Sequence, residues 1–199
     1  MRRQLLPAIV SMVVFTVVLG IAFPLVVTGI AQVAFNDKAD GSLVTKDGKV
    51  IGSSMLAQPF TTANGTPIKR YFQPRPSAAN YDPTASSGSN LGPTNPKLLR
   101  AVRRRTSAYR VLNGLSQDVK VPVDAVTASA SGLDPDISPA FARLQEAAVA
   151  AARGITVAQV DALVHRYTNG RDLGFLGEPR VAVLQLNLAL DENYPYHGH

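Results

Sequence analysis

The hydrophobic pattern is dominated by a run from Gln4 to Asn36 that contains no charged residue and consists mainly of Val, Ile, Leu, Phe and Ala. About 20 apolar residues in a helix cross a hydrocarbon core of ~30 Å, so this run predicts a transmembrane helix over residues 7–35. A cleaved signal peptide is the alternative, because Arg2 and Arg3 supply its basic start. Signal peptides have an apolar region of only about 7–15 residues, which favours a retained anchor.

The charges on either side of the run predict its orientation. The basic residues before it have no acidic neighbour, whereas acids and a lysine are mixed just after it. These residues are Arg2, Arg3, Asp37, Lys38 and Asp40. The positive-inside rule then places residues 1–6 in the cytoplasm and a domain of residues 36–199 outside it.

The beginning of the outer part predicts β-structure. Two short β-prone runs, residues 42–45 and 49–52, flank Asp47-Gly48, and Asp-Gly between such runs is a strong hairpin signal. Residues 58–60 and 70–72 are candidates for further short strands. Later in the chain, residues 121–126 and 181–184 have the composition of extended segments, with a Leu-rich stretch following to Leu190.

Three helices are predicted from start and stop signals. Their N-caps are Asn95, Ser138 and Thr156, the first two followed by Pro and the third forming a capping box with Gln159; Asn113-Gly114, Gly154 and Asn169-Gly170 end them. Together with the strands they predict a mixed α/β domain behind one transmembrane helix.

Two loops rich in small and polar residues separate these elements. Residues 73–96 combine Pro, Ser, Gly and Asn with Tyr81, and residues 127–136 form a second Ser/Gly segment. A long loop in a compact domain is usually disordered or functional. The aromatic, Asn and Pro content favours an ordered loop that lies on a surface.

The charge pattern adds a possible binding surface. The net charge is +6, and the helix that starts at Asn95 carries a basic face. That face contains Lys97, Arg100, Arg103, Arg104 and Arg110. A solvated helix face and a binding surface remain equal alternatives. Nucleic acid is not expected as a partner of a domain outside the cytoplasm, whereas membrane lipid is.

Candidate chemistry is sparse, and we expect neither catalytic residues nor a metal site. There is no Cys, His165 lies within a predicted helix, and His197 and His199 stand at the chain end, which is too few ligands for a metal. The serines around Ser129 do not form a GxSxG or SxxK motif. A membrane-anchored hydrolase or binding protein outside the cytoplasm stays open as the alternative.

Several strings resemble one family, the C subunit of the Kdp-type potassium-transporting ATPase. They are Gly41-Ser42-Leu43, Gly52-Ser53, residues 71–78 (YFQPRPSA), residues 87–96 (SGSNLGPTNP), Val121-Pro122, residues 126–135 (VTASASGLDP), residues 137–139 (ISP) and residues 186–191 (LNLALD). Their order agrees along nearly the whole chain. Ala130 and Asp136 depart from the family pattern, which usually has Gly and His there.

The resemblance implies an accessory, non-catalytic subunit of an ATP-driven, high-affinity potassium uptake complex in the bacterial inner membrane. Its partners are then a P-type ATP-hydrolysing subunit and a potassium-channel-like subunit. The family is described as a catalytic chaperone that raises the ATP affinity of the hydrolysing subunit. ATP is therefore implied for the complex, and no cofactor is expected for this chain itself.

Three sets of residues are candidate sites. The candidate partner interface consists of Arg75, Ser89, Asn90, Thr94 and Asn95, although Asn95 is equally explained as a helix cap. The candidate Ser/Gly functional loop consists of Thr127, Ser129, Ser131, Gly132 and Asp134. Small and polar residues suited to helix packing in lipid are Ser11, Thr16, Gly20 and Gly29.

Overall fold

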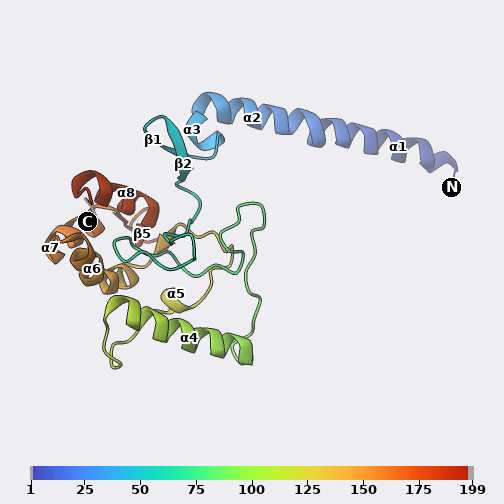
Figure 1. Cartoon of the computed structure of the whole chain (residues 1–199). Helices are drawn as coiled ribbons and strands as arrows, with labels where there is room; N and C mark the ends of the chain where they lie inside the picture. Colours follow the sequence, from blue (N-terminus) through green and yellow to red (C-terminus); the bar gives the residue numbers. More distant parts are fainter. Residues whose placement is uncertain (1, 197–199) are drawn as a thin grey trace. The chain divides into compact units, whose positions relative to one another are not determined.

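The computed structural model describes residues 2–196, which fall into two compact units, Met1–Ser53 and Ser54–His199. The first unit begins with the apolar helix (Figure 1). It runs from Arg3 to Ala34 with a mean hydropathy of 2.6 in its most apolar window, none of which is buried. That exposure is consistent with single-pass membrane anchoring and differs from a core helix, whose apolar residues are covered by protein.

A short π-helical segment divides this apolar helix. Its parts are α1 (Arg2–Val17), η1 (Val18–Ala22) and α2 (Phe23–Ala34). Proline has no N–H, and its ring clashes with the carbonyl four residues earlier in an α-helix. Pro24 stands just after η1, where the Phe23 N–H bonds Val18 O five residues back. The wider turn relieves the clash and keeps the helix continuous.

The predicted hairpin is confirmed in the rest of the first unit. After α3 (Asn36–Ala39), β1 (Leu43–Lys46) and β2 (Lys49–Ser53) pair antiparallel, with a bulge between Val44 and Thr45. Asp47 and Gly48 have φ of 51° and 74°. Positive φ at both central residues is what a two-residue hairpin turn needs to match the strand twist.

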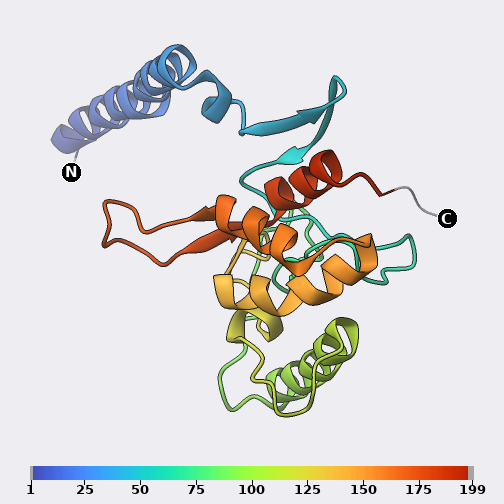
Figure 2. The same cartoon turned by 90° about the vertical axis from the view of Figure 1, so that its left-hand side faces the viewer.

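The second unit is a mixed domain of helices and a small antiparallel sheet, as predicted. Its elements are α4 (Pro96–Asn113), α5 (Val123–Val126), β3 (Asp136–Ile137), α6 (Pro139–Arg153), α7 (Val157–Arg166), β4 (Thr168–Asn169), β5 (Arg180–Ala182) and α8 (Val183–Asn193). The sheet order is β3-β5-β4. Figures 1 and 2 show α6, α7 and α8 gathered on one side and α5 beside α4.

The three predicted helix starts are confirmed by their caps. The Asn95 side chain accepts from Lys97 N, the Ser138 side chain from Phe141 N, and Thr156 forms the capping box with Gln159. Gly114 and Gly154 close α4 and α6 in the left-handed conformation. These are local signals, and they hold because each satisfies backbone groups that the helix itself leaves unpaired.

Several predicted extended segments are wrong. Residues 121–126 contain the helical turn α5, and the strand predicted at 181–184 stops at Ala182, where α8 begins. The third helix ends at Arg166 rather than near Asn169, because the chain enters β4. Burial explains why α8 was mistaken for an extended segment. Most of this helix is covered by protein, so it lacks the polar stripe by which a surface helix is recognised in sequence. The buried residues are Val183, Leu184, Leu186, Asn187, Ala189 and Leu190.

The segments predicted as strands at 58–60 and 70–72 form no strand, yet the backbone around Phe72 is fully bonded. Asn187 accepts from Phe72 N and donates to Phe72 O, both at 2.9 Å. Gln145 does the same for Gln73, at 2.8 and 3.3 Å. Both amide side chains are 1% exposed. Two buried amides thus take the place of a neighbouring strand and fix this segment across α6 and α8.

The core lies under this segment and between the helices. Phe72, Phe141, Val160, Val181 and Leu186 are at most 1% exposed. The Tyr109 and Phe141 rings meet edge to face, 5.3 Å between centroids, and join α4 to α6.

One buried carboxyl in α6 predicts a pH dependence of stability. Glu146 is 7% exposed and its Oε1 has no hydrogen-bond partner. Burial raises the pKa of Glu146, Asp161 raises it further, and Arg143 and His165 oppose them. A carboxyl whose pKa is higher in the fold than in the unfolded chain costs stability as pH rises through that range.

We therefore expect Glu146→Gln to raise the melting temperature of the full chain in detergent by a few degrees near pH 7. The gain should shrink towards about pH 4, where the native carboxyl is protonated as well. Circular dichroism melts across this range measure it. A gain of equal size at both ends would show that ionisation of Glu146 is not its cause.

Candidate functional site

The two polar loops, far apart in sequence, lie directly against each other. Ser129 N donates to Pro76 O at 3.2 Å, and Ser87 N donates to Ser131 O at 2.9 Å. The Ser86 hydroxyl donates to the same Ser131 carbonyl at 3.0 Å. The candidate functional loop and the 73–96 loop are thus one structural feature, called here the loop pair (residues 73–96 with 127–136).

Two glycines allow this close approach. A Cβ on Gly88 would lie 2.8 Å from Ala130 O, and one on Gly132 would lie 2.7 Å from Ser87 O. Gly132 also has φ +70°. Only glycine meets both demands without strain, because other residues rarely adopt this φ and carry the Cβ that would collide. Ala130 itself is exposed, so the methyl group at this family departure is accommodated.

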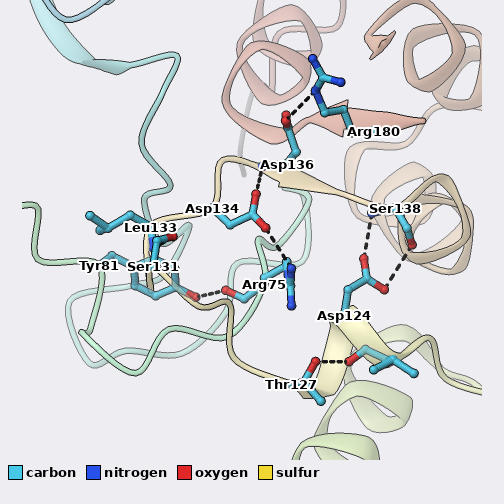
Figure 3. A network of polar contacts seen from close by, with 11 residues as sticks. Arg75, Tyr81, Asp124, Thr127, Ser131, Leu133, Asp134, Asp136, Ser138 and Arg180 are labelled. Atoms are coloured by element: carbon cyan, nitrogen blue, oxygen red, sulfur yellow. Dashed lines mark hydrogen bonds and ion pairs between the residues drawn. The ribbon is translucent and has the colours of Figure 1, made fainter. Parts of the chain in front are cut away.

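An ion pair crosses the loop pair at one end. Arg75 Nη1 lies 2.9 Å from Asp134 Oδ2, with the side chains 25% and 30% exposed (Figure 3). Tyr81 donates its hydroxyl to Arg75 O at 2.9 Å. Asp134 Oδ1 accepts from Asp136 N at 3.1 Å. The charges of Arg75 and Asp134 are therefore largely committed to holding the loops together.

The surroundings shift two titratable groups. Burial raises the pKa of Tyr81, opposed by Arg105. Burial also raises the pKa of Asp136, with Asp134 adding to it, while Arg180 opposes them at 3.2 Å. Asp136 stands where the family usually has His, and here its carboxylate bonds β5 rather than facing an open site.

Thr127 and its neighbours support the loop pair from α5 and α6. The Thr127 hydroxyl donates to Val123 O at 2.7 Å, which closes α5. Asp124 accepts from Ser138 N at 2.8 Å and from the Ser138 hydroxyl at 3.2 Å. These contacts explain Thr127 as a structural residue.

The predicted interface residues occupy different places. Arg75 is within the loop pair, whereas Ser89, Asn90 and Thr94 are exposed along the 73–96 loop. Asn90 has φ +52°, a left-handed conformation that Asn tolerates better than most residues. Asn95 caps α4 through its 2.8 Å bond from Lys97 N. Their contact with a partner stays a prediction.

Sequence reasoning missed Tyr81, Asp124 and Ser87 as parts of this arrangement. No local motif marks the bonds that Tyr81 makes to Arg75 O, Asp124 to Ser138 or Ser87 to Ser131 O. Asp134 is different, because Asp followed by Pro commonly bonds its own backbone two residues on, and this is the bond it makes to Asp136 N.

The predicted packing residues of the apolar helix are all exposed. The Thr16 hydroxyl donates to Met12 O at 2.8 Å. A Cβ on Gly20 would lie 3.9 Å from Thr16 Cγ2, so these two share a face, and Gly20 is within η1. Ser11 and Gly29 lie in α1 and α2. The open π turn beside Thr16 makes this face the best candidate for close helix packing.

Among residues 2–196 no group of three or more His, Cys, Asp or Glu is placed to hold a metal. His165 is exposed on α7, 3.6 Å from Asp161, while His197 and His199 lie outside the described residues. A mostly apolar groove of about 650 Å³ lies beside the loop pair, between α4 and residues 59–76. Tyr81, Arg105 and Phe141 line it.

We expect Asn95→Ala to lower domain stability by about 0.5–2 kcal/mol, because Lys97 N loses its cap. Thermal melts of the full chain measure this change. Thr156→Ala, which removes the cap of α7 and lies outside both loops, is the matched control. If Asn95→Ala leaves melting unchanged but loosens association with other subunits, Asn95 belongs to the interface instead.

Comparison with known proteins gives a consistent answer. The family model described as K+-transporting ATPase, c chain, matches residues 5–192. A curated protein of Mycobacterium bovis, named potassium-transporting ATPase KdpC subunit, is 57% identical over 193 residues, 96% of this chain and 99% of its own. Proteins of the same name from Methylococcus capsulatus and Beijerinckia indica are 52% and 48% identical, covering 93% and 98% of this chain and 95% and 96% of theirs.

These matches cover the apolar helix, both loops and the terminal helix in one alignment, as the resemblance predicted. They assign the chain as a non-catalytic accessory subunit of the Kdp ATPase, which takes part in potassium transport with the other Kdp subunits. With its apolar helix, loop pair and α8 all inside the matched region, the chain belongs to the KdpC family.

Proposed function

We propose that this chain holds the Kdp complex together from outside the cytoplasm and thereby raises the ATP affinity of the P-type hydrolysing subunit. The loop pair supports this role most directly. It is ordered by its own cross-loop bonds, yet it leaves Ser89, Asn90 and Thr94 exposed on its outer side. A polar surface that is fixed before binding loses little entropy when a partner covers it.

The proposed orientation has the N-terminus in the bacterial cytoplasm and the domain beyond the inner membrane. Arg2 and Arg3 support it through the positive-inside rule. In this orientation the domain faces the outer side of the potassium-channel-like subunit. ATP is cytoplasmic, so the effect on ATP affinity is indirect and passes through the apolar helix or through assembly.

One helix face and one loop surface take part in this proposal. The face with Thr16 and Gly20 packs against a helix of another subunit within the membrane, where small residues let backbones approach. The outer side of the loop pair contacts the extracytoplasmic surface of the channel-like subunit. Coupling between the two contacts is how a domain outside the cytoplasm acts on a cytoplasmic nucleotide site.

The test is affinity capture of the full chain from gently solubilised native membranes, followed by measurement of the ATP KM of the captured complex. We expect Thr94→Arg to release the channel-like subunit and raise the KM. Ser116→Arg, also at an exposed polar position but after α4, is the control. Full capture and an unchanged KM with Thr94→Arg would remove this surface from the interface.

The alternative of a self-sufficient hydrolase or binding protein predicts activity or ligand binding by the full chain purified alone. Labelling of the outer domain by an ATP analogue added outside intact, oriented vesicles would contradict the indirect route. In that case the nucleotide contact would be direct.

A further inference from the structure

The hairpin that joins β4 to β5 carries an exposed apolar tip. Every residue from 170 to 179 is exposed, and Figure 2 shows this segment reaching away from the helices of its unit. Leu173, Phe175 and Leu176 are 84%, 70% and 48% exposed. A cluster of large apolar side chains at a loop end marks an interaction site more often than a scattered surface residue does.

Three backbone N–H groups of the tip, those of Gly174, Phe175 and Leu176, are paired within the turn. Asp172 and Leu176 exchange two N–H···O bonds of 2.9 Å, and Gly174 N donates to Arg171 O at 3.2 Å. Backbone groups that are already paired can leave water at little cost, whereas unpaired ones cannot. The tip therefore has few N–H groups left to satisfy, and at the headgroup level its outer carbonyls stay within reach of water.

The backbone conformation at Leu173 does not favour a leucine at this position. Leu173 has φ +53° and Gly174 has φ +81°. A left-handed conformation is strained for leucine and easy for glycine or asparagine. The turn alone would favour a small polar residue, so an outward-facing leucine points to a contact that the apolar side chain makes.

The charged residues of the hairpin lie on either side of its apolar end and are paired with one another or with Asp136 of β3. Arg171 lies 2.8 Å from Glu178, and Arg180 lies 3.2 Å from Asp136 and 3.7 Å from Asp172. The apolar end from Leu173 to Leu176 has no charged residue. The hairpin therefore has an apolar end without charge, and the charged side chains next to that end are paired.

We propose that the tip from Leu173 to Leu176 inserts into the headgroup–acyl boundary of the bilayer that anchors the chain. This inference rests on the membrane anchoring in the proposed function. A lipid surface fits better than a protein partner, because three side chains supply far less than the ~800 Å² per partner that stable protein interfaces bury. Tethering by the apolar helix keeps the bilayer near the tip at a high effective concentration, so even a weak insertion is populated.

A single tryptophan tests the proposal, because the chain has none of its own. Phe175→Trp is placed in the full chain and reconstituted into liposomes whose acyl chains carry bromine, a short-range quencher. Val111→Trp is the matched control: Val111 is also exposed, at 77%, but lies in α4. Phe15→Trp, in the apolar helix, reports the anchoring itself.

We expect brominated lipid to quench Phe175→Trp and Phe15→Trp at least twofold and to leave Val111→Trp unchanged. If only Phe15→Trp is quenched, the chain is anchored and the tip insertion is wrong. If Phe15→Trp is not quenched either, the anchoring fails and both proposals fall with it.

A second measurement uses the assembled complex. With a photo-crosslinking amino acid at position 175, the proposal expects adducts with lipid. Adducts with another subunit in place of lipid would overturn it, because the tip would then be a protein contact.

Discussion

Replacing Arg153 by alanine is expected to lower the stability of the outer domain by about 3–5 kcal/mol. The Arg153 side chain is 0% exposed and ion-paired with Asp191 at 2.8 Å. Its guanidinium also donates to Arg70 O at 2.7 Å and to Leu190 O and Tyr194 O at 3.2 Å. Removing it leaves one carboxylate and three carbonyls without their cation.

The position of Arg153 explains why the loss should be large. It is the last residue of α6; it bonds Tyr194 O just after α8 and adds a second bond to Leu190 O, which already accepts from Tyr194 N. Its guanidinium also lies 4.9 Å from the Tyr71 ring centroid, and Tyr71 donates to Asp191 at 2.9 Å. One side chain therefore joins two helix ends to the segment that precedes Phe72.

Melts of the full chain in detergent, followed by circular dichroism of the tyrosines, measure the effect. The expected decrease in melting temperature is roughly 6–20 °C, at about 2–4 °C per kcal/mol for a domain of this size. Asp191→Asn keeps the shape and the three carbonyl bonds but leaves the 0% exposed guanidinium without its carboxylate, so it measures the ion pair separately from the carbonyl bonds. Equal losses for the two variants would mean that the ion pair, rather than the carbonyl bonds, carries the stabilisation.

Features that depend on bonds between neighbouring residues could be predicted from the sequence, whereas features that depend on distant contacts could not. Asn95, Ser138 and Thr156 could be identified as helix caps because each bonds a backbone N–H only two or three residues away. The Asp47-Gly48 turn is equally local. In these features both partners of each interaction lie in the same short segment, so the segment alone is enough to predict them.

The failures involve contacts between distant residues. Residues 70–72 have the composition of a strand, but the backbone of Phe72 and Gln73 is paired by the Asn187 and Gln145 side chains, more than 70 positions away. The apolar run from Val181 looks extended because α8 is buried along most of its length, which removes the helical stripe. Neither fact is visible in a local window of sequence.

The candidate site was predictable in its parts but not in its assembly. Both polar loops stood out by composition, and the resemblance named strings in each. That Arg75 reaches Asp134, and that Ser87 bonds Ser131, follows from how α4 to α6 bring the loops together. Residues singled out as a functional loop, such as Ser131 and Gly132, are placed by the structure as the contacts that hold the other loop.

Replacing Gly132 by alanine is expected to open the loop pair, because it adds both strain and collision. At φ +70° an alanine is strained, and its Cβ would lie 2.7 Å from Ser87 O and 3.0 Å from Ala79 Cβ. Strain of this kind costs about 1–3 kcal/mol. Forcing atoms into a packed site costs about 1–3 kcal/mol more. The expected loss of stability is therefore roughly 2–6 kcal/mol.

Two matched variants separate the causes. Gly154 has φ +69° but nothing within 4 Å of its Cβ position, so Gly154→Ala measures strain alone. Gly88 meets Ala130 O at 2.8 Å without a positive φ, so Gly88→Ala measures the collision alone. Melts of the three variants, each combined with capture of the Kdp subunits, complete the test.

If the loop pair forms the interface, Gly132→Ala and Gly88→Ala should both reduce capture of the channel-like subunit, whereas Gly154→Ala should lower the melting temperature without affecting capture. The expected difference in capture comes from the position of each variant and not from its effect on stability, because Gly154 ends α6 and lies outside both loops. Equal loss of capture for Gly154→Ala and Gly88→Ala would show that assembly follows overall domain stability. In that case the loop pair would be a structural element of the domain, and the contact surface would have to lie elsewhere.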